Sequence, residues 1–494
     1  MSPSLEDQKP TTEYTAVIAT PKADGDLADV PKSSSTIESC STAFLFLLCC
    51  PKMALNVAWA AQWAALGPLL QILIPSSWVQ IVQLVGPISG LLIAPSIGVL
   101  SDNCTSKFGR RRPFLFWGAL MSCLCWLVMM FCTDIGEALG DTPAKLLDTL
   151  PSDQVSRKWT TVFIILTYIW MDITLNLTQT PLNLLIADFA GERQVTASSL
   201  GNAYSIAGSF VVSGYIMAFG PAHESVKPFM CLLIAVMLIT AGAVLYFVKE
   251  KVFVATTSVS KAQEIKSAFA AVWTGIRLLP KTLAIYCVII VFVQYGFTAY
   301  MGAKGQFFGL VVKNGTSDNA DKCGHDGNPP CSAQQIAYND GVQLAGGVTD
   351  TIYNCVSLLY LAVLPYLVRK FGVKKVITAS IVPQIFLIAM AYCKVVAIDM
   401  IIVIACAFTQ NTLLSLFMAT IIHVIGHEEN SGLGLFAGAL NSAYCAGQFL
   451  NFIFSSILVT SSMGYALPIL VGGVLSAIGF LISLFCFKIE LYST

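Results

Sequence analysis

Long apolar runs constrain the fold of this chain more than any other feature. A helix needs about 20 mostly apolar residues to cross the hydrocarbon core of a bilayer. Twelve such runs are present, and they account for a composition of 56% hydrophobic and only 11% charged residues. The sequence therefore predicts an all-α membrane protein with twelve transmembrane helices. The runs lie near 45–73, 78–100, 114–133, 159–187, 195–219, 227–249, 282–308, 341–367, 373–393, 398–424, 432–460 and 465–487.

Basic residues cluster in short loops between these runs. The positive-inside rule assigns such loops to the cytosol. If the runs alternate across the membrane, both clusters lie on one side, and both termini share it. We therefore expect cytosolic termini, and a plasma-membrane location because no organellar or retention signal is evident. The clusters are Lys107, Arg110, Arg111 and Arg112 after the second run, and Arg369, Lys370, Lys374 and Lys375 after the eighth.

The two basic clusters also indicate an internal repeat. FGRRR (108–112) follows the second run, and RKFGVKK (369–375) follows the eighth. This spacing is typical of two six-helix halves related by a parallel repeat. Such halves move about a site near the bilayer midplane, so the sequence predicts an alternating-access carrier rather than a channel or a membrane enzyme. The predicted divisions are a disordered cytosolic tail at 1–41, a six-helix bundle at 42–249, a cytosolic linker with an interfacial helix at 250–281, a second bundle at 282–488 and a tail at 489–494.

One acidic residue lies deep inside the fourth run. Asp172 is fourteen residues beyond Lys158, which places it about 20 Å along a helix and near the bilayer midplane. A charged Asp at that depth costs about 2.5–3.5 kcal/mol. Asp172, Asn176, Gln179 and Asn183 share one helical face, which predicts the wall of a polar cavity. The alternative is that these groups only hydrogen-bond to neighbouring helices.

The chemistry of these residues favours a proton-coupled saccharide carrier. Burial disfavours the charged form of a carboxyl, so Asp172 is suited to bind a proton on one side and release it on the other. It can also accept hydrogen bonds from a polyol. Amides suit hydroxyl groups and indole rings suit a pyranose, although ordinary helix packing is the alternative for the tryptophan. The expected substrate-binding residues are Asn56, Trp59, Gln62, Asp172, Asn176, Gln179, Asn183, Asn441, Tyr444 and Gln448.

Cofactor and macromolecular partners are not expected. The four histidines are scattered, and no motif indicates a metal, a nucleophile or an enzyme active site. Basic and acidic residues are equal in number, 28 each. The expected partners are the lipid bilayer, a small saccharide and a proton, with no nucleic acid. The sequence does not set the oligomeric state, for which a monomer is the default.

A second pair of charges lies in the second half. Lys304 is near the end of the seventh run, and Asp350 is at similar depth in the eighth. Opposite charges in adjacent spans lower the free-energy cost of placing each charge in the membrane. We therefore predict a Lys304–Asp350 pair in the outer half of the pathway. The alternative is that Lys304 extends to the lipid headgroups.

The polar segment between the seventh and eighth runs is expected on the side opposite the basic loops. It contains Cys323 and Cys331, for which a disulfide is expected if this side is oxidising. It also contains Asn314 in an N-x-Thr sequon. The sequons at Asn103 and Asn176 are expected to be cytosolic and intramembrane. Only Asn314 is therefore a predicted glycosylation site.

Several segments resemble a known family. SDNCTSKFGRRRPF (101–114), VAWAAQ (57–62), QLVGPISGLLIAPSIGVLSD (83–102), GNAYS (201–205) and GLGLFAGALN (432–441) are similar to the plant sucrose transporters and related animal sugar carriers. These belong to the glycoside–pentoside–hexuronide:cation symporter family. The resemblance implies a major facilitator fold and proton symport of sucrose or a similar glycoside, with Asp172 as the residue that couples to the proton and contacts the sugar.

The basic loop has two interpretations within this resemblance. Asp102 is expected either to cap the third helix or to pair with Arg110, Arg111 and Arg112 when the cytosolic side is closed. A role only in membrane orientation is the alternative for the arginines.

The chain also departs from the plant pattern. The plant members carry an arginine eleven residues after the coupling acid, and this chain has Asn183 there. Proton-independent sugar uniport is therefore the main alternative to symport. The sequence is also compatible with transport of an amino acid or another polar solute, and with a non-transporting sugar sensor.

Overall fold

The computed structural model describes residues 41–143, 146, 155–190, 193–250, 261–323, 330–425 and 433–489. All but one residue of each predicted tail, 1–41 and 489–494, lies outside these ranges. In the part of the chain that is described, the regular secondary structure is helical and contains no strand.

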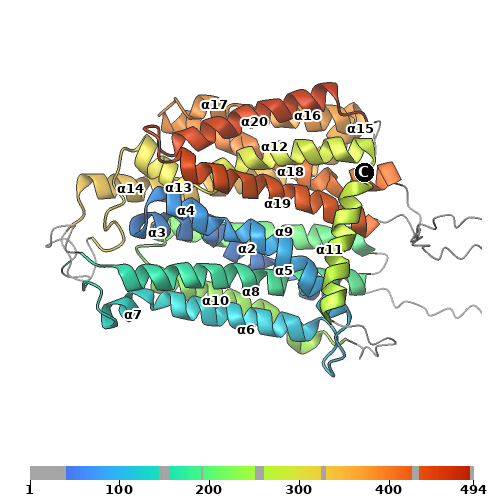
Figure 1. Cartoon of the computed structure of the whole chain (residues 1–494), viewed down its shortest axis with the longest axis horizontal. Helices are drawn as coiled ribbons and strands as arrows, with labels where there is room; N and C mark the ends of the chain where they lie inside the picture. Colours follow the sequence, from blue (N-terminus) through green and yellow to red (C-terminus); the bar gives the residue numbers. More distant parts are fainter. Residues whose placement is uncertain are drawn as a thin grey trace, which may run out of the picture. The chain divides into compact units, whose positions relative to one another are not determined.

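Six long helical rods form the first half (Figure 1). The first rod contains a π-helical segment, η1, between two α-helical parts. The second rod bends at Leu84, and the short helix α7 follows the third. The elements are α1 Thr42–Cys49, α2 Pro51–Ala61, η1 Gln62–Leu66, α3 Gly67–Leu73, α4 Ser76–Gln83, α5 Val85–Asp102, α6 Arg112–Met130, α7 Cys132–Ala138, α8 Lys158–Ala190, α9 Gln194–Phe219 and α10 Val226–Phe247.

Six further rods form the second half, and π-helical segments interrupt two of them. The elements are α12 Lys281–Met301, α13 Lys304–Gln306, η4 Phe307–Val312, α14 Ala333–Gln343, η5 Leu344–Thr349, α15 Asp350–Phe371, α16 Val373–Ile385, α17 Leu387–Met390, α18 Val396–Ile425, α19 Leu433–Leu458 and α20 Ala466–Phe485.

Length and composition support a membrane location for these rods. Within the described residues, ten of them are long and apolar enough to cross a bilayer. The remaining two, α9 and α19, have 26 residues each, which is more than the about 20 that a span requires. The chain is a multi-pass membrane protein.

The two basic loops have the same backbone feature. Gly109, with φ +103°, follows Phe108 between α5 and α6, and Gly372, with φ +80°, follows Phe371 between α15 and α16. Both values lie in the left-handed region that favours glycine. The phenylalanine–glycine turn therefore recurs at equivalent places in the two halves, as expected for an internal repeat.

The buried hydrophobic core is divided between the halves. One cluster of buried residues draws only on the chain from Leu45 to Val248. Two others draw only on the chain from Leu283 to Phe487. A small fourth cluster in the second half, Ala320, Tyr338 and Val342, packs against Ile72 of the first half.

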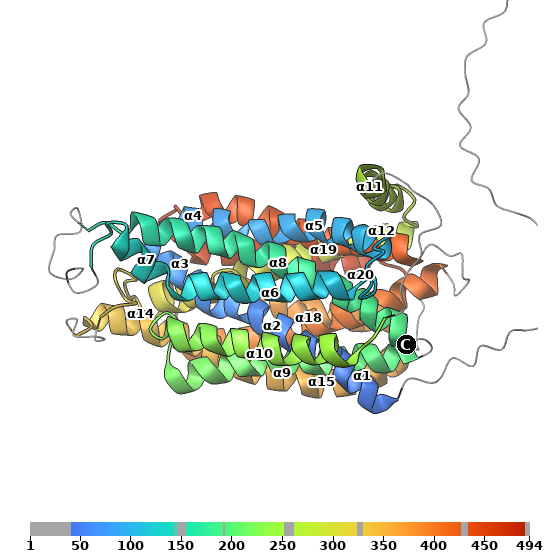
Figure 2. The same cartoon turned by 90° about the horizontal axis from the view of Figure 1, so that it is seen from below.

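The amphipathic helix α11, Lys261–Arg277, lies in the predicted linker. It contacts α5 and α19 and crosses their ends (Figures 1 and 2). We call this end of the helices, which carries the loops at Gly109 and Gly372, the basic face. The opposite end, which carries the loop between η4 and α14, is the disulfide face.

Candidate functional site

A cavity of about 680 Å³ lies between the two halves. This volume is in the usual range for small-molecule sites. It gathers nearly all the residues expected to bind substrate. The predicted residues that line it are Asn56, Trp59, Gln62, Asn176, Gln179 and Asn183 from the first half, and Asn441, Tyr444 and Gln448 from the second.

Hydrogen bonds between helices hold part of the polar wall in place. Asn56 Nδ2 donates to Ser209 Oγ on α9 at 2.6 Å. Trp59 Nε1 donates to Gln179 Oε1 on α8 at 2.7 Å. Trp63, which also lines the cavity, stacks on Phe452 of α19 at 5.9 Å between ring centroids. The wall therefore presents ordered amide groups and indole rings.

Asp172 lies directly behind this wall. Its side chain is completely buried and does not line the cavity. Gln62 Nε2 donates to Asp172 Oδ1 at 3.1 Å and to the Tyr168 hydroxyl at 2.7 Å. Asp172 is therefore the one predicted substrate-binding residue that does not line the cavity in this structure. The cause is the side chain of Gln62, which stands between the carboxyl and the cavity.

Gly86 of α5 lies beside both Asp172 and Gln62. A Cβ atom on Gly86 would lie 3.5 Å from Asp172 Oδ1 and 3.8 Å from Gln62 Nε2. Both Gly86 and Gln62 line the cavity. One side chain and one glycine therefore separate the carboxyl from the cavity.

The buried Lys304 forms a charge pair with the half-buried Asp350. Lys304 Nζ hydrogen-bonds to Asp350 Oδ2, and the lysine is only 1% exposed. Both residues line the cavity. The ammonium group is thus directed to Asp350 and not to lipid headgroups. The pair lies at helix irregularities, because Lys304 begins α13 and Asp350 directly follows the π-helical segment η5.

Adjacent glycines in η5 bring the two halves into close contact. A Cβ on Gly346 would lie 3.1 Å from the Ala64 Cβ, and one on Gly347 would lie 3.0 Å from the Met217 backbone nitrogen. Single-turn π segments occur often at functional sites. Here η5 places Asp350 next to the cavity while it packs against the first half.

Contacts between the halves close the disulfide face. Arg157 and Asp321 form two hydrogen bonds, at 2.9 and 2.7 Å. The Tyr338 hydroxyl donates to the Pro68 carbonyl at 3.0 Å. We call these contacts, with those of His223 and Tyr465 described below, the seal.

From the seal, the cavity extends toward the basic face. Its wall reaches Lys52, at the start of α2, and Asn183, late in α8. Lys52 is ten residues before Gln62, a distance of about 15 Å along the helix. The cavity therefore reaches well into the half of the bundle that is nearer the basic face.

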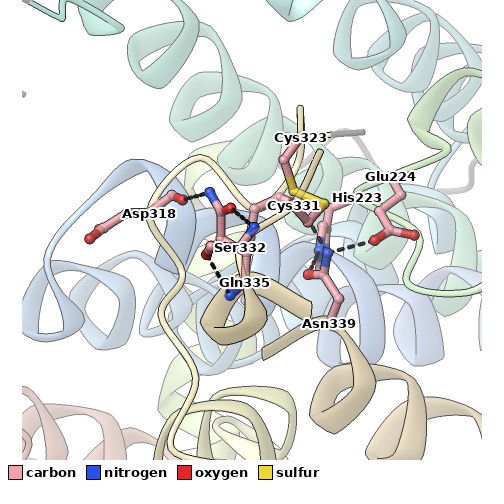
Figure 3. Close-up of a disulfide and its surroundings, with 9 residues drawn as sticks. His223, Glu224, Asp318, Cys323, Cys331, Ser332, Gln335 and Asn339 are labelled. Atoms are coloured by element: carbon pink, nitrogen blue, oxygen red, sulfur yellow. Dashed lines mark hydrogen bonds between the residues drawn. A yellow bond between two sulfur atoms is a disulfide. The ribbon is translucent and has the colours of Figure 1, made fainter. Parts of the chain in front are cut away.

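The loop of the disulfide face is held by its own disulfide. Cys323 and Cys331 are bonded (Figure 3). Nearby, Asn339 Nδ2 donates to Glu224 Oε1, and His223 Nε2 donates to Asn339 Oδ1 at 2.8 Å. Asn339 belongs to the second half, whereas His223 and Glu224 belong to the first. This cluster is therefore part of the seal.

Charges in the seal respond differently to acid. Burial raises the pKa of Asp321, but the neighbouring Arg157 guanidinium outweighs burial and holds this pKa below its usual 3.8. Burial lowers the pKa of His223 below its usual 6.5, against the opposing effect of Asn339. His223 Nδ1 has no partner among the described residues. The imidazole is therefore neutral in the seal.

We expect acid to weaken the seal through His223. Opening hydrates the imidazole and returns its pKa to about 6.5. The contribution of His223 to the stability of the seal is therefore complete above about pH 6.5. It declines as the pH falls toward the lower pKa of the imidazole in the sealed form. Hydrogen exchange in α14, corrected for intrinsic pH dependence, should accelerate below about pH 6.5. Replacing His223 with glutamine, which keeps an amide donor, should remove the acceleration; a variant that still accelerates would contradict this role.

Ion pairs connect the basic loop to other elements of the first half. Arg111 is 3% exposed and pairs with Asp102 and with Asp188, the latter at 3.3 Å. Arg110 pairs with Asp188 at 2.9 Å. These ion pairs join the basic loop to α5 and α8 of the first half. The expected pairing of Asp102 with the arginines is present for Arg111, and its dependence on closure of this side stays a prediction.

The remaining arginine has backbone partners. Arg112 donates to the carbonyl oxygens of Phe108, at 3.3 Å, and Leu245. The Glu250 carboxylate accepts from the backbone N–H groups of Arg111, at 3.0 Å, and Arg112, at 2.8 Å. The network thus reaches the end of α10.

Sequence reasoning missed several of these residues. Ser205 and Ser209 line the cavity, and their i, i+4 spacing on one helix face is a signal that was available. Asp188 and Glu250 are acids near the basic loop. Arg157 and Asp321 lie in separate loops, and no pattern in the sequence relates them.

Comparisons with known proteins agree with this architecture. No model of a protein family matches the sequence. Over 177 residues, 36% of this chain, it is 34% identical to "Sucrose transport protein SUC3" of Arabidopsis thaliana. Over 160 residues, 32% of this chain, it is 36% identical to "Sucrose transport protein SUT3" of Oryza sativa subsp. japonica. The matches span only 29% and 31% of those proteins.

Solved structures show the fold over nearly the whole chain. The crystal structure of a D-xylose-proton symporter matches with a TM-score of 0.59 and 16% identity, over 91% of this chain and 99% of that one. The nucleoside transporter NupG matches with a TM-score of 0.56 and 12% identity, over 90% and 99%. The predicted fold class and the predicted resemblance are both confirmed. This protein has the twelve-helix fold of the major facilitator transporters, and about a third of its sequence is similar to plant sucrose transport proteins.

Proposed function

We propose that this protein is a proton-coupled symporter of sucrose or a related small saccharide. The observation that carries the proposal is the pairing of two features. One is a polar cavity of about 680 Å³ between the halves, and the other is a fully buried carboxyl, Asp172, separated from it by Gln62. The similarity to sucrose transport proteins and the fold of a sugar–proton symporter support the same conclusion.

The cavity supplies the chemistry that a saccharide requires. Asn441 and Gln448 face Asn176 and Gln179 around the same cavity. Amides both donate and accept hydrogen bonds, so they can pair with a hydroxyl group that acts as an acceptor or as a donor. Trp59 and Trp63 add apolar ring surface to the wall. Lys304 is less well suited to bind the carboxylate of an amino acid, because its ammonium group is already paired with Asp350. Lys52 lines the cavity toward the basic face, away from this pair.

Asp172 supplies the proton site in this mechanism. An uncharged carboxyl is favoured where the group is buried, so the proton travels with Asp172 while the halves move. Displacement of the Gln62 side chain then connects the carboxyl with the cavity. Asn183, in place of the plant arginine, leaves this acid without a neighbouring cation on its own helix face.

The driving force is sufficient for concentrative uptake. A pH difference of about one unit is worth ~1.4 kcal/mol per proton, and a potential of about 100 mV adds ~2.3 kcal/mol. One proton per sugar could therefore sustain roughly 500-fold accumulation.

For membrane placement, we propose the plasma membrane with both termini and the basic face in the cytosol. The Lys and Arg residues of the two basic loops support this orientation. The disulfide supports an oxidising environment for the opposite face. The protein is then a carrier without enzymatic activity, sealed outside and accessible inside in this conformation. A monomer is sufficient for this mechanism.

Glycosylation of Asn314 tests the orientation. Asn314 is exposed on the disulfide face, next to η4. If this face is extracellular, expression in cells that glycosylate should give a protein whose gel mobility increases after glycosidase treatment. Asn314→Gln should show the increased mobility without treatment, whereas Asn103→Gln, on the basic face, should leave the mobility unchanged. Loss of the glycan only in the Asn103 variant would reverse the orientation.

Uptake into proteoliposomes tests the function. Radiolabelled sucrose, maltose, glucose and proline are offered with and without an inward proton gradient. Accumulation of a saccharide above equilibrium that collapses with a protonophore supports symport. Equilibration that is insensitive to the gradient indicates uniport, and binding without flux indicates a sensor. Uptake of proline alone would contradict the substrate class.

A further inference from the structure

Two fully buried glutamines lie between the cavity and the seal without a hydrogen-bond partner among the described residues. Gln83, at the end of α4, and Gln306, at the end of α13, are both 0% exposed. Among the described residues, neither the amide nitrogen nor the amide oxygen of either side chain has a partner. Buried polar groups are almost always hydrogen-bonded, and leaving them unpaired is costly. Four unpaired atoms in one place therefore require an explanation.

The two amides come from opposite halves and meet at Gly67. A Cβ atom built on Gly67 would lie 3.1 Å from Gln83 Nε2 and 3.4 Å from Gln306 Nε2. A fifth unpaired atom lies on the same rod as Gly67, because Gln62 Oε1 is also buried without a partner among the described residues. The three glutamines thus border one small region around η1.

This region is the layer directly beyond the cavity. Gln83 is three residues from Gly86, and Gln306 is two residues from Lys304. Gly86 and Lys304 line the cavity, whereas Gln83 and Gln306 do not. The seal lies on the other side, since Tyr338 hydrogen-bonds to the Pro68 carbonyl and Tyr465 to Gln71.

The helix α19 also carries a buried amide without a hydrogen-bond partner among the described residues. Asn451 is 0% exposed, and both of its amide atoms lack a partner within the described residues. The helix α19 packs against α4, which carries Gln83. Unpaired amides are therefore found on both sides of the surface along which the halves meet.

We infer that Gln83, Gln306 and Gln62 form an entry subsite for saccharide hydroxyls, which becomes accessible when the halves part at the disulfide face. Separation of α4 from α19 frees the buried amides to donate and accept. Three amides near one another match the adjacent hydroxyls of a sugar ring. Because Gln62 also lines the cavity, the substrate passes from this subsite to the cavity without losing contact with it.

The inference rests on the proposed saccharide transport, so its test separates the two. The full chain is reconstituted, and the half-saturation concentration for entry from the disulfide face is measured for the transported saccharide and its monodeoxy analogues. For the wild-type protein, we expect the half-saturation concentration of at least one analogue to be about tenfold higher than that of the parent saccharide, because one hydrogen bond is lost. If no saccharide enters at all, the proposed function fails with the subsite.

Methionine has nearly the same size as glutamine. Gln83→Met and Gln306→Met should each raise the half-saturation concentration for the parent saccharide by about tenfold. In each variant, the ratio between the half-saturation concentrations of one deoxy analogue and the parent should fall to near one. A variant that raises the values for all substrates by the same factor would show that the amide only biases the conformation, and would overturn the subsite. Unchanged values for both variants would overturn it as well.

Gln384 of α16 provides the matched control. It is also 0% exposed, but its amide nitrogen donates to the Val293 carbonyl at 2.7 Å and to Ser476 Oγ at 2.8 Å. Gln384→Met should lower thermal stability and leave the discrimination between analogues intact. Gln83→Met and Gln306→Met remove unpaired groups and should not lower thermal stability. A loss of stability equal to that of the control would place the two amides in the packing of the fold and contradict the subsite.

Discussion

Replacing Asp172 with asparagine should abolish the accumulation of saccharide above equilibrium. Asparagine has nearly the same size, and its amide oxygen can still accept the hydrogen bond that Gln62 donates at 3.1 Å. It has no titratable proton, so a proton gradient can no longer drive the carrier. The expected roughly 500-fold concentrating capacity should fall to equilibration. Uptake into proteoliposomes, with and without a protonophore, measures this change directly.

A surface acid controls for the removal of a carboxyl. Asp134 pairs with Lys227 at 2.9 Å, and both side chains are more than half exposed. Asp134→Asn should therefore transport as the wild type does. Thermal unfolding of detergent-solubilised protein should be similar for all three proteins, which shows that the fold is retained. An Asp172→Asn variant that still concentrates sugar in a protonophore-sensitive way would exclude Asp172 as the coupling residue.

Separating Lys304 from Asp350 is expected to have the second large effect, on stability. Lys304 is 1% exposed, so Asp350→Asn leaves a buried ammonium without a counter-charge. Loss of one partner of such a pair typically costs about 3–5 kcal/mol. We expect Asp350→Asn and Lys304→Met each to yield little folded protein, as measured by size-exclusion chromatography and by the midpoint of thermal unfolding.

Removing both charges together distinguishes pairing from independent roles. Lys304→Met combined with Asp350→Leu leaves no isolated charge and should recover most of the lost stability, because apolar replacement of a buried pair is often neutral or stabilising. The double variant should still transport poorly, since both side chains line the cavity. If the two single losses simply add in the double variant, the residues do not act as a pair.

Breaking the exposed Asp134–Lys227 pair gives the comparison for this experiment. Exposed ion pairs contribute about 0.2–1 kcal/mol. Lys227→Met should therefore change the unfolding midpoint only slightly. A large effect there would mean that the assay responds to any lost charge and not to burial.

The location of helices and the polar face of α8 could be predicted from the sequence because both depend on local properties. Twelve apolar runs match twelve helical rods in the described residues, and most rods end within a few residues of the predicted limits. The eighth rod begins at Ala333, eight residues before its predicted start. The positions of Asn176, Gln179 and Asn183 follow from helical periodicity alone. The same holds for Asn441, Tyr444 and Gln448 on α19, and all six line one cavity.

The exact placement of Asp172 depended on tertiary packing. Periodicity assigns it to the polar face of α8, yet it lies behind Gln62, because η1 and Gly86 pack against that part of the helix. A π-helical segment shifts the side chains that follow it, and no pattern in the apolar residues indicates where it begins. The helix that carries Asp172 was therefore predictable, whereas its exposure to the cavity was not.

The sequence by itself determined the class of protein, its twelve spans, its repeat and the polar faces of individual helices, since these follow from hydrophobicity, charge and the 3.6-residue period. Only the tertiary structure decided which polar groups meet. Arg157 with Asp321, His223 with Asn339, and Gln83 beside Gln306 join segments that lie far apart along the chain. Such contacts depend on how two independently packed halves face each other, and local periodicity carries no information about that.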